Sequence, residues 1–167
     1  MRLLTTRIKR WILRRSTGII VLEFSWSKST GSRAYSLVAA RKDNAKKLAS
    51  YYYSLFPHYH SARFRVSKQK LITTFLKRLQ QVKKFLDFLV VSHNKNTILS
   101  ALSNIMKIYG NSCIIADPVF RNNLRGLSFR IEDKKKEPTF IKVLINIADN
   151  AANWFRVSGT AWLVKIL

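Results

Sequence analysis

Residues 125–147 read RGLSFRI, EDKKKEP and TFIKVLINI in succession, and this stretch decides the predicted fold. Apolar residues occupy every other position from Leu127 to Ile131 and again from Ile141 to Ile147. Such alternation is typical of strands that bury one face. The sequence therefore predicts a β-hairpin with one apolar face and a basic, charged connection between its strands.

The composition around this hairpin indicates a folded protein that binds a polyanion. The chain has 167 residues, of which 47% are hydrophobic and 12% aromatic, enough for one or two small domains with a buried core. Lysine and arginine number 31 against 8 acidic residues, which gives a net charge of +23. A surface with this charge repels itself unless a polyanion neutralises it, which favours nucleic acid or an anionic membrane as the partner.

The charge is concentrated in the first half of the chain. Residues 1–84 contain 20 of the 31 basic residues and two of the acids. We therefore expect a basic RNA-binding extension over 1–84 and a compact domain over 85–167. No apolar run approaches the roughly 18–20 residues that a membrane span requires. An amphipathic helix could still lie on a membrane surface, but the soluble-domain patterning of the rest of the chain favours RNA over lipid as the partner.

Within the extension, residues 1–17 contain six basic residues and no acid, a composition that resembles a mitochondrial transit peptide. The interpretation we favour is a retained nucleic-acid-binding tail. Residues 19–24 and 34–40 are expected to pair as a hairpin with a basic tip. A helix from about residue 45 to 56, closed by Pro57, and an amphipathic helix over 70–84 complete the extension.

The second part alternates strands and helices. We expect a strand at 85–91, a helix at 97–109 that stops at Gly110, a strand at 112–116, a short helix at 149–155 and a closing strand at 161–167. If residues 112–116 and 125–131 form one interrupted strand, the order is β-α-β-β-α-β. This order predicts an α+β fold, a ferredoxin-like sandwich.

This second part resembles the bacterial-type small-subunit ribosomal protein S-six family, including its mitochondrial members. The likeness lies in the element order, in a strand of the type 139–147, and in the positions Phe120, Arg125, Leu127, Phe129 and Ile131. The chain departs from the family in its short second helix and in its basic first half. The resemblance implies a structural constituent of the small ribosomal subunit, in the mitochondrial matrix, which binds ribosomal RNA beside a small basic partner resembling ribosomal protein S-eighteen.

The mechanism expected from the charge is phosphate binding with counterion release, so that affinity falls steeply as salt rises. Shape and phosphate contacts would dominate, because the deep groove of double-stranded RNA excludes side chains. The candidate RNA-binding residues come from the tail, the two helices of the extension, and the hairpin with its connection: Arg7, Lys9, Arg10, Arg14, Arg15, Arg41, Lys42, Lys46, Lys47, Lys77, Arg78, Lys83, Lys84, Arg125, Arg130, Lys134, Lys135, Lys136 and Lys142.

Catalysis is not expected from the sequence, and neither is a cofactor or a metal. No phosphate-binding loop and no HExxH motif occurs. Asp117 and Asp149 are isolated acids, better suited to capping a turn or helix than to acid–base work. The single cysteine, Cys113, excludes an intrachain disulfide and fits a small core residue. His58 and His60 have ligand-like spacing but lack acidic or cysteine neighbours.

Two other functions remain open from the sequence. One is a single-strand nucleic-acid-binding module outside the ribosome, with the sheet as a stacking platform; the hairpin lacks the aromatic pattern of such modules. The other is a peripheral membrane or complex-assembly subunit anchored by residues 1–17 and 70–84.

Overall fold

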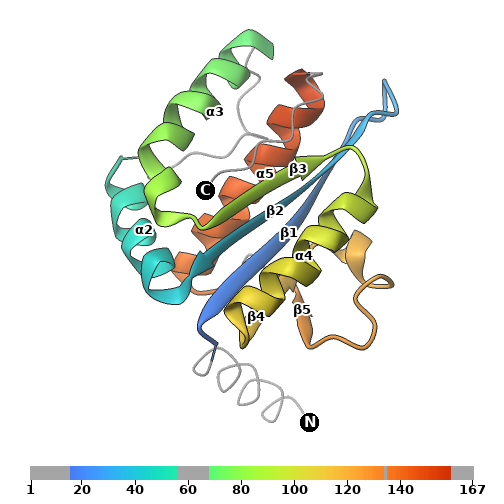
Figure 1. Ribbon diagram of the computed structural model, residues 1–167. Helices are drawn as coiled ribbons and strands as arrows, with labels where there is room; N and C mark the ends of the chain where they lie inside the picture. Colours follow the sequence, from blue (N-terminus) through green and yellow to red (C-terminus); the bar gives the residue numbers. More distant parts are fainter. Residues whose placement is uncertain (1–15, 56–67, 134, 159–167) are drawn as a thin grey trace.

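The computed structural model describes residues 16–55, 68–133 and 135–158, and their central feature is a five-stranded mixed sheet (Figure 1). The strand order is β3-β2-β1-β4-β5. β2 pairs antiparallel with β1 and β3, whereas β1, β4 and β5 pair in parallel. The strands are β1 (Gly18–Trp26), β2 (Arg33–Arg41), β3 (Phe88–Ser92), β4 (Ser112–Ala116) and β5 (Phe129–Ile131).

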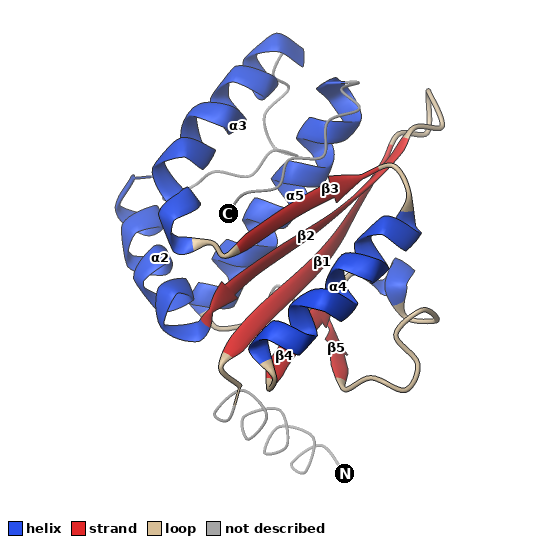
Figure 2. Ribbon diagram, in the orientation of Figure 1, coloured by secondary structure: helices blue, strands red, loops and turns tan. Residues whose placement is uncertain are grey.

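Helices cover both faces of the sheet, which gives a three-layer α+β fold (Figure 2). One face carries α4 (Lys95–Tyr109), and the other carries α2 (Lys42–Leu55), α3 (Lys68–Val82) and α5 (Thr139–Ser158). Side chains of β1 alternate between the layers: Ile19 and Val21 join the core with α5, while Ile20 and Leu22 join the core with α4. This alternation makes β1 the strand that both cores share.

Several predicted elements are confirmed. The hairpin of residues 19–24 and 34–40 is β1 with β2, the two helices of the extension are α2 and α3, and the strand at 112–116 is β4. The helix predicted at 97–109 is α4, which Asn94 caps and which ends at Gly110 with φ 64°. Glycine adopts this left-handed backbone without the steric cost that a side chain brings.

The predicted hairpin at 125–147 is wrong. Only residues 129–131 of this stretch form a strand, and residues 139–147 are the first half of α5, which also absorbs the short helix expected at 149–155. Pro138 fits a position just before the first helical turn, and the apolar positions continue at helical spacing through Leu144, Ala148 and Phe155. A helix buried on most sides shows alternate apolar positions by coincidence, and this produced the error.

The predicted division at residue 85 does not coincide with a boundary in the sheet. β1 and β2 come from residues 1–84, yet β3 pairs with β2, and β4 pairs with β1. β4 and β5 are two neighbouring strands rather than one interrupted strand. The predicted tail, up to residue 15, and the closing strand predicted at 161–167 lie outside the described residues.

Tyr109 links the end of α4 to the end of β2 and the start of β3 through Asp87. Its hydroxyl donates a 2.6 Å hydrogen bond to Asp87 Oδ2, which also accepts a 2.9 Å bond from the Arg41 backbone N–H. Burial raises the pKa of Tyr109 well above its usual value of about 10, and the hydrogen bond and charge of Asp87 raise it further. The neutral phenol is therefore the form that the fold stabilises.

This arrangement predicts a loss of stability in alkaline solution. Because the pKa is higher in the folded state, the stabilisation is complete below about pH 10 and declines above that pH, where the unfolded tyrosine ionises. We expect the Tyr109→Phe variant to lose about 1–2 kcal/mol of unfolding free energy at pH 7. It should also decline less steeply than the parent above pH 10 in urea titrations. Parallel declines of the two proteins would contradict this role of Tyr109.

Candidate metal centre

Three carboxylates converge on the face of the sheet that α5 covers. Glu23 lies within β1, Asp117 directly follows β4, and Glu132 directly follows β5. One oxygen from each lies within 4.8 Å of the others. Glu23 is only 2% exposed, and the other two are half-buried. The group, here named the carboxylate trio, is the one cluster of this kind among the residues that the structure describes.

Backbone hydrogen bonds between neighbouring strands align the three residues along the strand direction. The Asp117 N–H donates to the Leu22 carbonyl at 2.9 Å, and the Glu132 N–H donates to the Ala116 carbonyl at 3.1 Å. Asp117 and Glu132 therefore each continue the backbone pairing of the sheet by one residue beyond the end of β4 and of β5. Asp117 is also held by its own side chain, which accepts a 2.8 Å hydrogen bond from the Val119 N–H.

The topology makes this edge a natural ligand site. From β1 the chain builds the sheet in one direction through β2 and β3, and then returns to add β4 and β5 on the other side. The strand order thus reverses between β1 and β4. In open α/β sheets, ligands bind outside the carboxyl ends of the parallel strands at such a reversal. Asp117 and Glu132 stand at those carboxyl ends.

The negative charge of the trio favours a cation among its oxygens. Two like charges 4 Å apart repel by about 4 kcal/mol at an effective dielectric constant of about 20, and a shared cation turns this repulsion into attraction. Three of the 8 acidic residues of the chain stand in this one cluster. Carboxylate oxygens at this spacing suit a hard divalent cation such as Mg²⁺ or Mn²⁺.

Helix α5 brings a fourth acid, Asp149, to the same height. Ser36 pairs with Glu23 across β1 and β2, and its hydroxyl donates a 2.7 Å hydrogen bond to the Ala148 carbonyl. Asp149 is the next residue of α5. Farther along, Arg156 Nε donates to Ser25 Oγ at 2.9 Å. Asp149 and Arg156 are seven residues apart and share one flank of α5, since a helix turns about 100° per residue.

This flank lies on the β4 side of α5. The opposite flank is occupied, because Trp154 packs its ring 5.3 Å from that of Phe75 in α3, and Phe155 lies 4.5 Å from the ring of His93 beside β3. The β4-side flank is polar, with Lys142, Asn146, Asp149, Asn153 and Arg156. A helix that is otherwise apolar thus presents its polar residues toward the side of the sheet where the trio stands.

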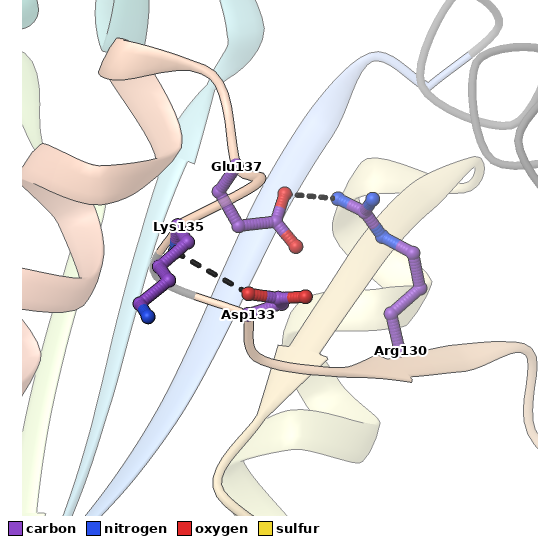
Figure 3. Close-up of polar contacts among 4 residues, drawn as sticks. All are labelled: Arg130, Asp133, Lys135 and Glu137. Atoms are coloured by element: carbon purple, nitrogen blue, oxygen red, sulfur yellow. Dashed lines mark hydrogen bonds and ion pairs between the residues drawn. The ribbon is translucent and has the colours of Figure 1, made fainter.

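A basic loop leaves the trio directly after Glu132. Asp133 orders the loop, since its side chain accepts from the Lys135 N–H at 3.3 Å and pairs with Lys136 Nζ at 3.1 Å. The loop is anchored by Glu137, whose carboxylate points at the Arg130 guanidinium with a separation of 2.9 Å (Figure 3). The two side chains of this pair are 5% and 14% exposed. Lys135 and Lys136 remain exposed.

The candidate RNA-binding residues that the structure describes do not form one surface; they lie in two separate exposed sets, and some of them are half-buried. Arg130 is occupied by Glu137, and Lys42 and Arg78 are half-buried. One exposed set lies at the end of β2, on α2, on α3 and on the turn after α3: Arg41, Lys46, Lys47, Lys77, Lys83 and Lys84. Another lies near β5 and α5: Arg125, Lys135, Lys136 and Lys142. The tail residues Arg7, Lys9, Arg10, Arg14 and Arg15, together with Lys134, His58 and His60, lie outside the described residues.

Sequence reasoning missed the trio because its members are 94 and 15 residues apart along the chain, and pairing brings them together. A signal was nevertheless present. Glu23 interrupts an otherwise apolar strand, and Asp117 and Glu132 each follow a strand immediately. A charge inside a buried strand is rare without a partner or a ligand.

Comparison with protein-family models, with curated proteins and with solved structures finds no match. None of the described helices combines the length and apolar character that crossing a membrane requires.

Proposed function

We propose that the protein is a divalent-metal-dependent hydrolase of nucleic-acid phosphodiester bonds. The observation that carries this proposal is the convergence of Glu23, Asp117 and Glu132 at the carboxyl ends of parallel strands in a chain of net charge +23. The cations would hold a polyanion, and the trio would hold the metal against it. Sequence patterns alone offered no reason to expect an enzyme, because each acid stands alone along the chain.

The chemistry assigned to the site is attack of water on a phosphorus atom. A bound Mg²⁺ or Mn²⁺ would polarise a phosphoryl oxygen and favour ionisation of the attacking water. The new P–O bond forms as the ester P–O bond breaks, and the leaving oxygen takes up a proton. The products are one phosphate monoester end and one hydroxyl end. Glu23, Asp117 and Glu132 would hold and orient the cation, and the burial of Glu23 would limit the access of further water molecules to it.

Incubation of the purified chain with end-labelled single- and double-stranded RNA and DNA tests this function. We expect cleavage with Mg²⁺ or Mn²⁺ and none with EDTA. We also expect the metal alone to raise the melting temperature, by an amount that corresponds to about 2.7 kcal/mol when its concentration is 100 times Kd. Absence of both cleavage and metal-dependent stabilisation would refute the proposal.

Asp149 is predicted to act on the same cation, directly or through a water molecule. We expect Asp149→Asn to lower metal-dependent cleavage by about 10- to 100-fold, the range typical of residues that orient metal ligands. The melting temperature in EDTA should stay within a few degrees of the parent, since asparagine conserves size. Asn153→Asp, one turn along the same flank, is the matched variant and should not restore activity to Asp149→Asn. Unchanged cleavage by Asp149→Asn would exclude it from the site.

A second candidate is binding of ribosomal RNA without chemistry, as a constituent of the small subunit. The observation that favours it is the cationic surface of α2 and the turn after α3, where Lys84 Nζ lies 5.2 Å from the Tyr51 ring and 5.1 Å from the Phe85 ring. The strand predicted at 139–147, part of the resemblance behind this candidate, is helical here. Co-sedimentation with small ribosomal subunits, reversed only by high salt, is its test.

A further inference from the structure

The trio and its surroundings offer more than a metal site, because cationic side chains lie on both sides of it along α5, and an exposed aromatic side chain lies three positions beyond Glu23 on β1. On one side stand Lys135 and Lys136, in the loop that leaves Glu132, and Lys142, in the first turn of α5; all three are exposed. On the other side stand Arg156 and the projecting hairpin of β1 and β2. Cationic residues of the loop and of α5 therefore stand at both ends of the trio.

The loop that follows Glu132 is ordered by internal contacts in a way that suits phosphate binding. Asp133 accepts a hydrogen bond from the Lys135 backbone N–H and pairs with Lys136 Nζ, and Glu137 pairs with Arg130, so the backbone of the loop is held before any ligand arrives (Figure 3). No acidic residue lies in the first turn of α5. A cation at a helix N-terminus opposes the helix dipole, so Lys142 gains its most favourable interaction when a phosphate is present.

An exposed tryptophan lies beyond the trio at the end of β1. Trp26, the last residue of β1, is 50% exposed and pairs with Arg33, which is also exposed. Figure 1 shows this hairpin tip extending past the neighbouring strands. Bonds between Ser27 and Ser32 and between Gly31 and Ser27 hold the tip in shape, so the indole is displayed on a firm support.

Trp26 and Glu23 lie close together along β1 but on opposite faces of the sheet. The two residues are three positions apart on β1, roughly 10 Å along a strand. Strand alternation assigns them to opposite faces of the sheet, so a strand that leaves the trio reaches Trp26 by rounding the projecting tip of the hairpin. A single strand bends readily enough to follow this path, whereas a stiff duplex does not.

From these observations we propose that the substrate is a single strand of nucleic acid, which stacks an unpaired base on Trp26 and lays phosphates on Lys135, Lys136 and Lys142 as it crosses the trio. Bases in a duplex are already stacked and paired, whereas an exposed indole beside a basic surface accepts any unpaired base. This inference rests on the proposed function, and it names the substrate class and its path.

The test measures binding of fluorescein-labelled 15-nucleotide single-stranded RNA and DNA, and of the matching duplexes, to the full chain by anisotropy. Ca²⁺ replaces Mg²⁺ to slow turnover. Trp26→Ala should weaken single-strand binding by about 5- to 150-fold, and Trp26→Phe should retain most of the affinity. Ile108→Ala is the control, because Ile108 is 58% exposed on α4. Equal losses in the Trp26→Ala and Ile108→Ala variants would remove the tryptophan from the path.

The lysines are tested by a triple change of Lys135, Lys136 and Lys142 to Gln. It should lower single-strand affinity by at least about tenfold and reduce the slope of log Kd against log salt by about 2. The matched control changes three lysines that are also exposed, on α2 and α3, namely Lys46, Lys47 and Lys77. A larger effect of the control set, or tighter binding of the duplex, would overturn the proposed path. Metal-dependent stabilisation measured in the same variants separates this failure from failure of the metal site, since the path can be wrong while the trio still binds metal.

Discussion

Replacing Glu23 by Gln or Asp117 by Asn is expected to reduce metal-dependent cleavage by at least about 100-fold, because loss of a direct carboxylate ligand should exceed the 10- to 100-fold cost of losing an outer partner. The same variants should be more stable than the parent in EDTA, by on the order of 1 kcal/mol, because each removes one charge from a group of like charges. The three carboxylates lie within 4.8 Å of one another.

A loss of cleavage together with a gain of stability in the same variants distinguishes a functional cluster from a structural one. Both substitutions keep the shapes of the side chains, and the amide oxygen introduced by Asp117→Asn would still accept the hydrogen bond from the Val119 N–H. Asp43→Asn, which changes an exposed acid in the first turn of α2, is the control and should leave cleavage unchanged. If Glu23→Gln lost stability in EDTA while retaining cleavage, the trio would be a structural feature and the hydrolase proposal would fail.

Local patterns were sufficient to predict most elements of this fold. The β1–β2 hairpin, α3 and α4 follow from strand alternation, from helical periodicity and from Gly110 as a stop signal. α5 could not be predicted in the same way. It is buried on most sides, so its apolar residues fit strand and helix periods equally well, and only packing against both the sheet and α3 decides between them.

The site was beyond sequence reasoning for a different reason. Glu23, Asp117 and Glu132 meet only because β1, β4 and β5 lie side by side, and strand order is a property of the whole chain. Candidate RNA-binding residues were easy to identify from their charge, but the sequence does not show which of them are available to a ligand. Arg130 and Lys136 look alike in the sequence, yet Arg130 is buried in an ion pair with Glu137 and Lys136 remains exposed. Local charge therefore suggested the class of partner, and pairing between distant strands suggested the chemistry.

A fragment comprising residues 85–167 is expected to be unfolded, although it contains α4, α5 and three of the five strands. In the intact sheet, β3 reaches β4 only through β2 and β1. Removing residues 1–84 would separate β3 from β4 and would expose the faces of α4 and α5 that pack on β1 and β2. Each large aliphatic side chain so exposed forfeits about 1.5–3 kcal/mol, and a few of them equal the roughly 5–15 kcal/mol by which small domains are stable.

Circular dichroism and urea titration of this fragment measure the effect directly, with a cooperative transition expected only for the full chain. The complementary fragment, residues 1–84, supplies the control: mixing the two should restore a cooperative transition, because β1 can then pair with β4 and β2 with β3. A fragment 85–167 that unfolds cooperatively by itself would mean that the second half has its own core and that the sheet order is different. Since Glu23 lies on β1 and Asp117 and Glu132 follow β4 and β5, recovery of metal-dependent stabilisation on mixing would show that the fold and the site assemble together.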